Sequence, residues 1–412
     1  MLEADNHTKT LQLALQGGGA HGAFTWGVLD TLLLDGRVRF GAISGTSAGA
    51  VNAVALAHGW ATAQAAGEDP AEGARVALGH VWRKVMGMGA MSESASRVAR
   101  LVMGALPGAW GKVSPYQANP LDFNPLRQLI ADTIDFDRIA RLKTPRVFVA
   151  ATDVETGRAA IFSGRRLTAQ AVMASACLPQ LFQAPEINGK LYWDGGYASN
   201  PALGPLVESG ESQDILLVQI NPLRRPGKPT TMAEITDRVN DLTFNASLIA
   251  QMRTIALVNE MVASGIARPG LKPIHMHRID GGKPLADMPA ATKITPQPAM
   301  LEQLFAIGQE SATRWLRKHF DAVGERSTVN LHRDYGDPLK LDFELPDDAD
   351  VPADGAEPEP DTARFRWTPE AQAHAATAAD AAARAATDAH APPGDAAGPA
   401  DGRTDGAPER SP

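Results

Sequence analysis

Two short apolar runs near the N-terminus each end at a glycine-rich turn that leads into a helical pattern. The first run, Leu11-Gln-Leu-Ala-Leu-Gln16, stops at three glycines, and a helical pattern follows from Ala20 to Leu34. The second run, Arg39-Phe-Gly-Ala-Ile-Ser44, leads through a sharp turn into an Ala-rich helix from about Ala48 to His58. Strand, helix, strand, helix is typical of a parallel sheet covered by helices, so we predict an α/β fold.

Further strands are expected in the middle of the chain, at residues 146–151, 190–193 and 215–220. Residues 60–120 interrupt the alternation, and we interpret them as a helical insertion or lid whose clearest helix spans residues 92–106. A long amphipathic pattern from Thr231 to Met261 predicts a helix that packs on the core. Its apolar stripe consists of Ile235, Val239, Leu242, Ala246, Ile249 and Met252.

Composition separates the last residues from the rest of the chain. The net charge of the 412 residues is -8, and residues 346–412, rich in Ala, Pro, Asp and Gly, account for all of it. We expect this segment to be disordered, because it cannot bury enough apolar surface to offset its chain entropy. We also expect a flexible N-terminus (1–10), a catalytic domain (11–222) and a C-terminal helical extension of it (223–345). The nearly neutral remainder lacks the basic excess of a nucleic-acid binder.

The single cysteine, Cys177, excludes an intramolecular disulfide, and we interpret it as a small buried hydrophobe. The polar N-terminus has no secretory signal, and no apolar run is long enough to span a membrane. These features favour a cytoplasmic location, with peripheral contact of the insertion with a membrane as a further expectation.

The turn after the second strand has the pattern Gly-x-Ser-x-Gly, with Gly45 and Gly49 on either side of Ser47. A nucleophile for acyl transfer has to stand clear of the backbone on a tight turn, and flanking glycines remove the Cβ atoms that would clash there. The pattern alone is weak in a chain with 38 glycines. Its position between a strand and a helix makes Ser47 the candidate nucleophile.

The glycine loop after the first strand, Gly17-Gly-Gly-Ala-His-Gly22, admits two interpretations. Glycines at the start of a helix let backbone N–H groups approach an anion, which could be a phosphate or the oxyanion of an acyl-transfer intermediate. The loop lacks the Lys-Ser/Thr ending of a P-loop and an intact dinucleotide-binding pattern. We therefore favour an oxyanion hole.

The sequence Trp193-Asp-Gly-Gly196 follows a predicted strand and has both a structural and a catalytic interpretation. Asp-Gly commonly forms a turn. A carboxylate at a strand end beside glycines can also reach a neighbouring loop, so Asp194 could accept the Ser47 proton as a general base. Asp153, ahead of Gly157, is more simply explained as a turn residue.

These three motifs, in this order, resemble the patatin-like phospholipase family over roughly residues 10–222. The resemblance implies a three-layer α/β/α fold and hydrolysis of fatty-acyl lipids by a Ser–Asp dyad, without metal or cofactor. Ser47 would be the nucleophile and Asp194 the base. The oxyanion loop would contain Gly17, Gly18, Gly19 and Gly22.

One position departs from the family pattern, since His21 stands where the family usually has Arg or Lys. A neutral imidazole would weaken the positive field at the oxyanion. Two alternatives stay open: a Ser-His-Asp esterase and a non-catalytic lipid-binding module. The esterase would take its histidine from positions that follow Asp194, namely His275, His277, His319 or His332.

Overall fold

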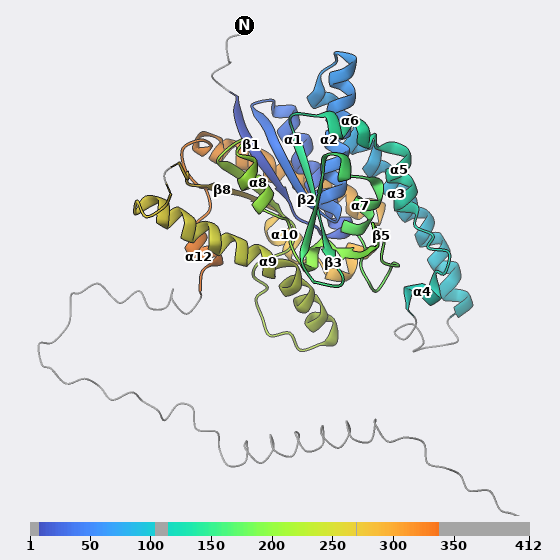
Figure 1. Ribbon diagram of the computed structural model, residues 1–412. Coiled ribbons are helices and arrows are strands. Elements are labelled where there is room, and N and C mark those ends of the chain that lie inside the picture. The colour runs from blue at the N-terminus through green and yellow to red at the C-terminus, as the bar shows by residue number, and fades with distance from the viewer. Residues whose placement is uncertain (1–7, 104–113, 269, 338–412) are drawn as a thin grey trace, which may run out of the picture. The chain divides into compact units, whose positions relative to one another are not determined.

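The structure is a computed structural model that describes residues 8–103, 114–268 and 270–337. Figure 1 shows a central sheet with helices on both of its faces. The expectations for residues 1–7, for residues 104–113 of the insertion and for the acidic segment 346–412 lie outside the described part of the chain.

The predicted central sheet is confirmed, and most of its strands are parallel. Its strand order is β5-β6-β3-β2-β1-β7-β8, with β4 attached to β3. β1, β2, β3, β7 and β8 run parallel, whereas β4, β5 and β6 are added antiparallel. The strands are β1 Lys9–Leu15, β2 Val38–Thr46, β3 Arg146–Asp153, β4 Ala159–Ser163, β5 Glu186–Ile187, β6 Lys190–Asp194, β7 Asp214–Gln219 and β8 His275–Asp280.

The helices form the two outer layers. The α-helices are α1 Gly22–Asp35, α2 Ala48–Ala66, α3 Pro70–Met103, α4 Pro115–Ala118, α5 Pro125–Thr133, α6 Phe136–Arg141, α7 Ala169–Ser175, α8 Gly204–Ser209, α9 Met232–Ala263, α10 Gly282–Ala286, α11 Pro298–His319 and α12 Leu331–Tyr335. Two short 3₁₀ turns matter for the site, η1 Gly19–His21 and η4 Ala290–Ile294.

Each face of the sheet has its own hydrophobic core. Because side chains alternate along a strand, Leu11, Leu13 and Leu15 of β1 enter one core and Ala14 enters the other. The first core contains residues of α1, α2, α3, α5, α6, α7 and α11. The second core is formed with α8, α9 and α12. This arrangement of helices, sheet and helices confirms the three-layer architecture.

Strand β3 brings the predicted motifs together, because both of its edges are paired. β4 occupies one edge at residues 148–152. The other edge first pairs with β2, where the last pair is Thr46 with Ala150. β6 then continues along that edge, and Asp194 pairs with Ala151. The end of β2 and the end of β6 therefore meet at consecutive positions of β3.

The interrupting segment at residues 60–120 is built mainly from α3, a single long helix that begins at Pro70. The predicted helix at residues 92–106 is the end of α3 as far as Met103, and its continuation lies outside the described residues. Strands β4, β5 and β8 had not been predicted. Within the described part of the chain, no helix combines the length and hydrophobicity needed to cross a membrane.

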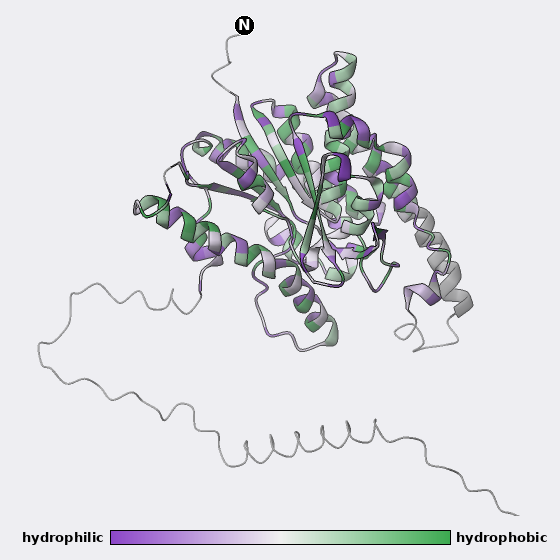
Figure 2. Ribbon diagram, viewed as in Figure 1, coloured by the Kyte–Doolittle hydropathy of each residue, from purple (hydrophilic) through white to green (hydrophobic). Residues whose placement is uncertain are grey.

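The residues of helix α9 that pack on the core differ in part from those predicted. It begins after the N-cap Thr231, whose side chain forms a capping box with Glu234, so the predicted start is confirmed. Figure 2 shows hydrophobic and hydrophilic residues interspersed along the helix. Ile235, Val239 and Leu242 were predicted to pack on the core, yet they are 38%, 56% and 51% exposed. The prediction is confirmed at Met252, which is fully buried, and at Ile249, which packs against the second core. The buried face also carries Asp241, Phe244, Asn245 and Leu248, which the predicted stripe did not include.

Candidate active site

Ser47 lies on a strained turn between β2 and α2. Its φ of 54° and ψ of −122° place a non-glycine residue in a conformation that L-residues rarely adopt. The Ser47 N–H donates to Ser175 Oγ at 2.8 Å, and Ser175 Oγ donates to Ala150 O at 2.6 Å. These hydrogen bonds tie the strained residue to β3 and hold the turn in place.

The two glycines that flank Ser47 are required by close backbone contacts. A Cβ atom on Gly45 would lie 2.4 Å from Gly49 O. A Cβ atom on Gly49 would lie 2.1 Å from Leu15 O, at the end of β1. Because side chains at these positions would collide with backbone, the turn can form only with glycine on both sides.

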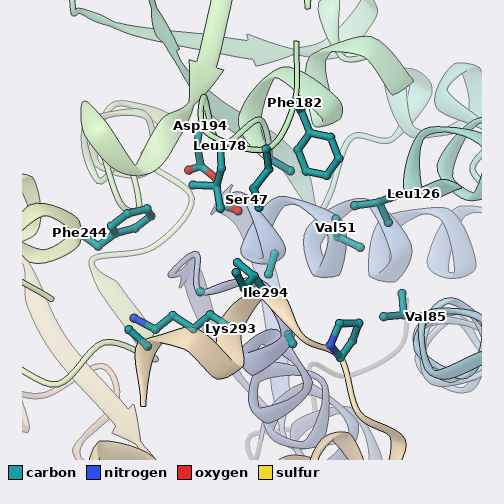
Figure 3. Close-up of a pocket in the computed structure, with 18 of the residues that line it drawn as sticks. Ser47, Val51, Val85, Leu126, Leu178, Phe182, Asp194, Phe244, Lys293 and Ile294 are labelled. Carbon is teal, nitrogen blue, oxygen red and sulfur yellow. The ribbon is translucent and has the colours of Figure 1, made fainter. Parts of the chain in front are cut away.

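Asp194 ends β6 and faces Ser47 in Figure 3. Its backbone is fixed from two sides, since Asp194 N donates to Cys177 O at 2.7 Å and Thr152 Oγ1 donates to Asp194 O at 2.8 Å. Its side chain is 1% exposed, and Oδ1 accepts a hydrogen bond from Gly196 N at 2.7 Å. The carboxylate is therefore oriented by the Asp-Gly-Gly turn that the sequence predicted.

Burial raises the pKa of Asp194 to about 7, against the lowering effect of hydrogen bonds from the Gly196 amide and the Ser47 side chain. Asp194 Oδ2 is buried without a hydrogen-bond partner of good geometry among the described residues. The contact between this carboxylate and the Ser47 side chain is therefore looser than a standard hydrogen bond. A carboxylate with a pKa near neutrality is suited to take and return a proton.

The glycine loop after β1 passes directly beneath the nucleophile. A Cβ atom on Gly17 would lie 2.8 Å from Ser47 Cβ, and the Gly17 N–H donates to Asn200 Oδ1 at 2.7 Å. The amide of Gly17 is thus already engaged, whereas Gly18 and Gly19 line the pocket. Gly22 packs against α2, where a Cβ would lie 2.7 Å from Ala48 Cβ.

Helix α2 directs its N-terminus at the same point. The first N–H groups of a helix have no partner within the helix, and the helix dipole makes this end positive. Ala48 is the first residue of α2 and lines the pocket beside Ser47. Gly18, Gly19 and Ala48 thus line the pocket beside Ser47.

The pocket beside Ser47 has a volume of about 290 Å³ and a largely apolar wall. In Figure 3, Val51, Val85 and Leu126 lie on one side of Ser47, and Phe244 and Lys293 lie on the other. The pocket is lined by Gly18, Gly19, Ala20, Ser47, Ala48, Val51, Trp82, Val85, Met88, Leu126, Ala176, Leu178, Leu181, Phe182, Asp194, Asn240, Phe244, Ala290, Lys293, Ile294 and Pro296. This volume is at the low end for ligand pockets.

Histidines are absent from the lining of this pocket, as far as the described residues show. His21 is buried with Nε2 2.7 Å from Thr292 Oγ1, and burial together with the charge of Lys293 lowers its pKa to about 4. His277, on β8, lies 3.0 Å from Asp214 Oδ1 at the start of β7.

The remaining histidines of the predicted set also have other surroundings. His275 is on β8, and its Nδ1 is 3.3 Å from Asp214 Oδ1. His319 ends α11, and His332 pairs with Glu260 at 3.0 Å. The predicted alternative of a Ser-His-Asp triad therefore finds no histidine at Ser47 in the described part of the chain.

Other candidate residues have structural surroundings. Cys177 is buried, and burial raises the pKa of its thiol to about 12, so it is not poised as a nucleophile. Asp153 forms the expected turn, with Thr156 N donating to its Oδ1 at 2.9 Å. Among the described residues, no three His, Cys, Asp or Glu side chains are grouped as a metal site would need.

Several residues at the site were not assigned a role from the sequence. Ser175 and Asn200 lie in stretches that resemble the family, which is a signal for their position but not for their hydrogen bonds. Phe244 is on α9 and Lys293 is on η4, where no sequence motif marks them. Their role depends on tertiary packing that a single sequence does not reveal.

Comparison with known proteins identifies a family that matches part of the chain. The sequence model of the family described as patatin-like phospholipase matches residues 13–207. No match is found among curated proteins. Among solved structures, the crystal structure of VipD from Legionella pneumophila is 15% identical and covers 80% of this chain and 73% of that chain, with a TM-score of 0.34. That likeness is too distant to carry an argument. The family match includes the glycine loop, Ser47 and Asp194, so residues 13–207 are the part of the chain that matches the patatin-like phospholipase family.

Proposed function

We propose that this protein is a serine lipid acyl hydrolase, of the phospholipase A, lysophospholipase or esterase type, which cleaves fatty-acyl esters through a Ser47–Asp194 dyad. The match to the patatin-like phospholipase family supports lipid acyl hydrolysis in general. The observation that carries the specific proposal is that Ser47, on its strained turn, faces a buried carboxylate with a pKa of about 7 beside an apolar pocket.

In the acylation step, Ser47 Oγ attacks the ester carbonyl while Asp194 takes the hydroxyl proton. The negative charge that develops on the carbonyl oxygen is stabilised by the amides of Gly18, Gly19 and Ala48. Collapse of the tetrahedral intermediate breaks the bond to the alcohol. Asp194 returns its proton to the departing alkoxide, leaving an acyl ester on Ser47.

In the deacylation step, a water molecule attacks the acyl-enzyme while Asp194 takes one of its protons. The same amides stabilise the second oxyanion. The bond to Ser47 then breaks, Asp194 returns the proton to Ser47 Oγ, and the fatty acid is released. No cofactor enters either step.

The pocket supports a fatty-acyl substrate. Val51, Val85 and Leu126 provide an apolar wall on one side of the nucleophile, and their burial of methylene groups would favour binding of an acyl chain. Leu181 and Ile294 line the pocket and are 42% and 53% exposed. Exposed apolar side chains at the pocket support peripheral contact with a lipid surface during substrate uptake.

The test is covalent labelling by a fluorophosphonate probe, followed by a panel of phospholipids, lysophospholipids, glycerides and simple esters with mass-spectrometric detection of products. We expect labelling of Ser47 and release of fatty acid. S47A should abolish both, and D194N should reduce both by roughly 10³-fold or more. An unlabelled wild-type Ser47 would indicate a non-catalytic lipid-binding module.

The alternative of a Ser-His-Asp esterase is tested with the same panel of substrates. H277Q removes the buried imidazole at Asp214, far along the sheet from the end of β2. We expect the H277Q variant, where it is folded, to have the kcat of the wild-type protein. Loss of turnover in H277Q together with retained turnover in D194N would overturn the dyad.

A further inference from the structure

The 3₁₀ turn η4, in the C-terminal extension, packs directly on the glycine loop. A Cβ atom on Gly19 would lie 2.2 Å from Lys293 O. His21 Nε2 lies 2.7 Å from Thr292 Oγ1. Backbone and side-chain contacts from consecutive residues of η4 therefore cover the glycine loop that lines the pocket beside Ser47.

The Lys293 side chain extends this contact through hydrogen bonds. Lys293 Nζ donates to Asn221 Oδ1 and to Asn240 Oδ1, both at 2.7 Å. Asn221 Nδ2 in turn donates to Gly17 O at 2.9 Å. The N–H of Gly17 is bound by Asn200 Oδ1. The carbonyl oxygen of Gly17 is bound by Asn221, which is held in turn by Lys293.

Lys293 also places positive charge beside the pocket. Asp241 is fully buried and is shared by Arg225 Nε at 2.8 Å and Lys293 Nζ at 3.7 Å, so two cations face one carboxylate. His21 is neutral at physiological pH because its pKa is about 4. Among the described residues that line the pocket, Lys293 is the sole cation.

The geometry points to Lys293 as a positioning residue that holds the Gly17–Gly19 loop in shape and supplies a positive field behind the oxyanion. This inference rests on the proposed function. It also means that η4 and α9, which lie beyond the family-matched residues 13–207, complete the active site. A positive charge that is fixed before reaction stabilises a developing anion without reorganisation.

The test compares K293M, which removes both the hydrogen bonds and the charge, with K293R, which keeps the charge. The control is K283M, because Lys283 is an exposed lysine of α10 that pairs with Asp287. With an uncharged short-chain ester, we expect K293M to lower kcat about ten-fold with KM changed by less than about two-fold. K293R should recover most of that loss, and K283M should match the wild-type protein.

The rate of Ser47 labelling by the fluorophosphonate probe gives a second readout, because the phosphoryl oxygen of that probe occupies the same oxyanion position. It should fall in parallel with kcat.

Should K293M fail to fold, K293Q, which keeps an amide donor but no charge, is expected to show the same loss. Unchanged kcat and labelling in a folded K293M or K293Q would overturn the inference. A raised KM for anionic lipids alone would also overturn it and would assign Lys293 to headgroup binding. Absence of wild-type labelling would reject the proposed function itself.

Discussion

Ser47 and Asp194 face each other because the strands that carry them pair with consecutive residues of β3. Thr46, just before Ser47, pairs with Ala150, and Asp194 pairs with Ala151. The separation of nucleophile and carboxylate is therefore set by the register of the sheet. A pair held by strand register is pre-organised, since no loop has to move to bring the two side chains together.

The activity should depend on pH through Asp194. A general base acts only when deprotonated, so kcat/KM should fall about ten-fold per pH unit below the Asp194 pKa of about 7 and level off above it. His21 cannot produce this limb, because its pKa is about 4. The measurement is the pH profile of kcat/KM between pH 5 and 9 with an uncharged ester. A flat profile across that range would contradict the assignment.

The same carboxylate should destabilise the fold at high pH. Its pKa is about 7 in the folded protein, well above the ordinary value of 3.8 for an aspartate, so the folded state favours the protonated form. The contribution of Asp194 to the free energy of unfolding should be fully present below about pH 4 and be lost as pH rises through 7, by up to about 4 kcal/mol. D194N keeps an acceptor for the Gly196 amide and has no charge to bury.

We therefore expect D194N to be more stable than the wild-type protein at pH 8, with the difference shrinking towards pH 4. Chemical denaturation at both pH values measures this difference in the free energy of unfolding. A difference that is the same at pH 4 and pH 8 would mean that burial of the charge is not its cause.

Asn200 should support the glycine loop. Its Oδ1 accepts from Gly17 N at 2.7 Å and its Nδ2 donates to Phe244 O at 3.1 Å, both in buried surroundings. N200A should lower the free energy of unfolding by about 1–3 kcal/mol, because a buried N–H loses its partner. It should also lower kcat, because Gly17 lies directly under Ser47.

The matched control for N200A is N259A. Asn259 also makes two backbone hydrogen bonds, both to Ile274 at 2.9 Å, on a part of α9 away from the pocket. N259A should lose similar stability and keep the wild-type kcat. Equal losses of kcat in N200A and N259A would show that Asn200 acts only through global stability.

The acyl-chain side of the pocket should control chain-length preference. Val85 of α3 lines the pocket opposite Phe244 in Figure 3. V85W should lower kcat/KM for long-chain esters by at least about ten-fold and leave short-chain esters nearly unchanged, because the larger side chain fills space within about 290 Å³. V76W is the control, since Val76 is 57% exposed on the same helix and does not line the pocket. A uniform loss across chain lengths would argue against this placement.

The first βα units could be predicted closely because their signals are local. An apolar run that stops at glycines fixes the end of β1, and Gly36 in the left-handed conformation ends α1 one residue after Asp35. β8 escaped prediction because His275, His277 and Arg278 give it a polar appearance, although His277 is fully buried against Asp214. Buried polar side chains hide a strand from a hydropathy pattern.

The positions of site residues could be predicted where short sequence motifs mark them. They could not be predicted where only tertiary packing brings a residue to the site. The positions of Ser47 and Asp194 follow from short motifs at strand ends. Lys293, Asn221 and Asn240 carry no such signal, because their contacts join segments more than fifty residues apart. Ile235, Val239 and Leu242 of α9 were misassigned to the core for a related reason, since helical spacing identifies a face of a helix but not how far along the helix that face meets the core.

The separation of Ser47 and Asp194 from the pocket wall has a consequence for how the specificity of the proposed hydrolase can diverge. Ser47 and Asp194 are attached to paired strands of the sheet, whereas Val85, Leu126 and Ile294 belong to helices and a 3₁₀ turn around it. On the proposed function, substitutions in the wall would exchange one lipid substrate for another while Ser47 and Asp194 stay in place. In engineering terms, the scaffold offers a fixed reaction with an adjustable substrate range.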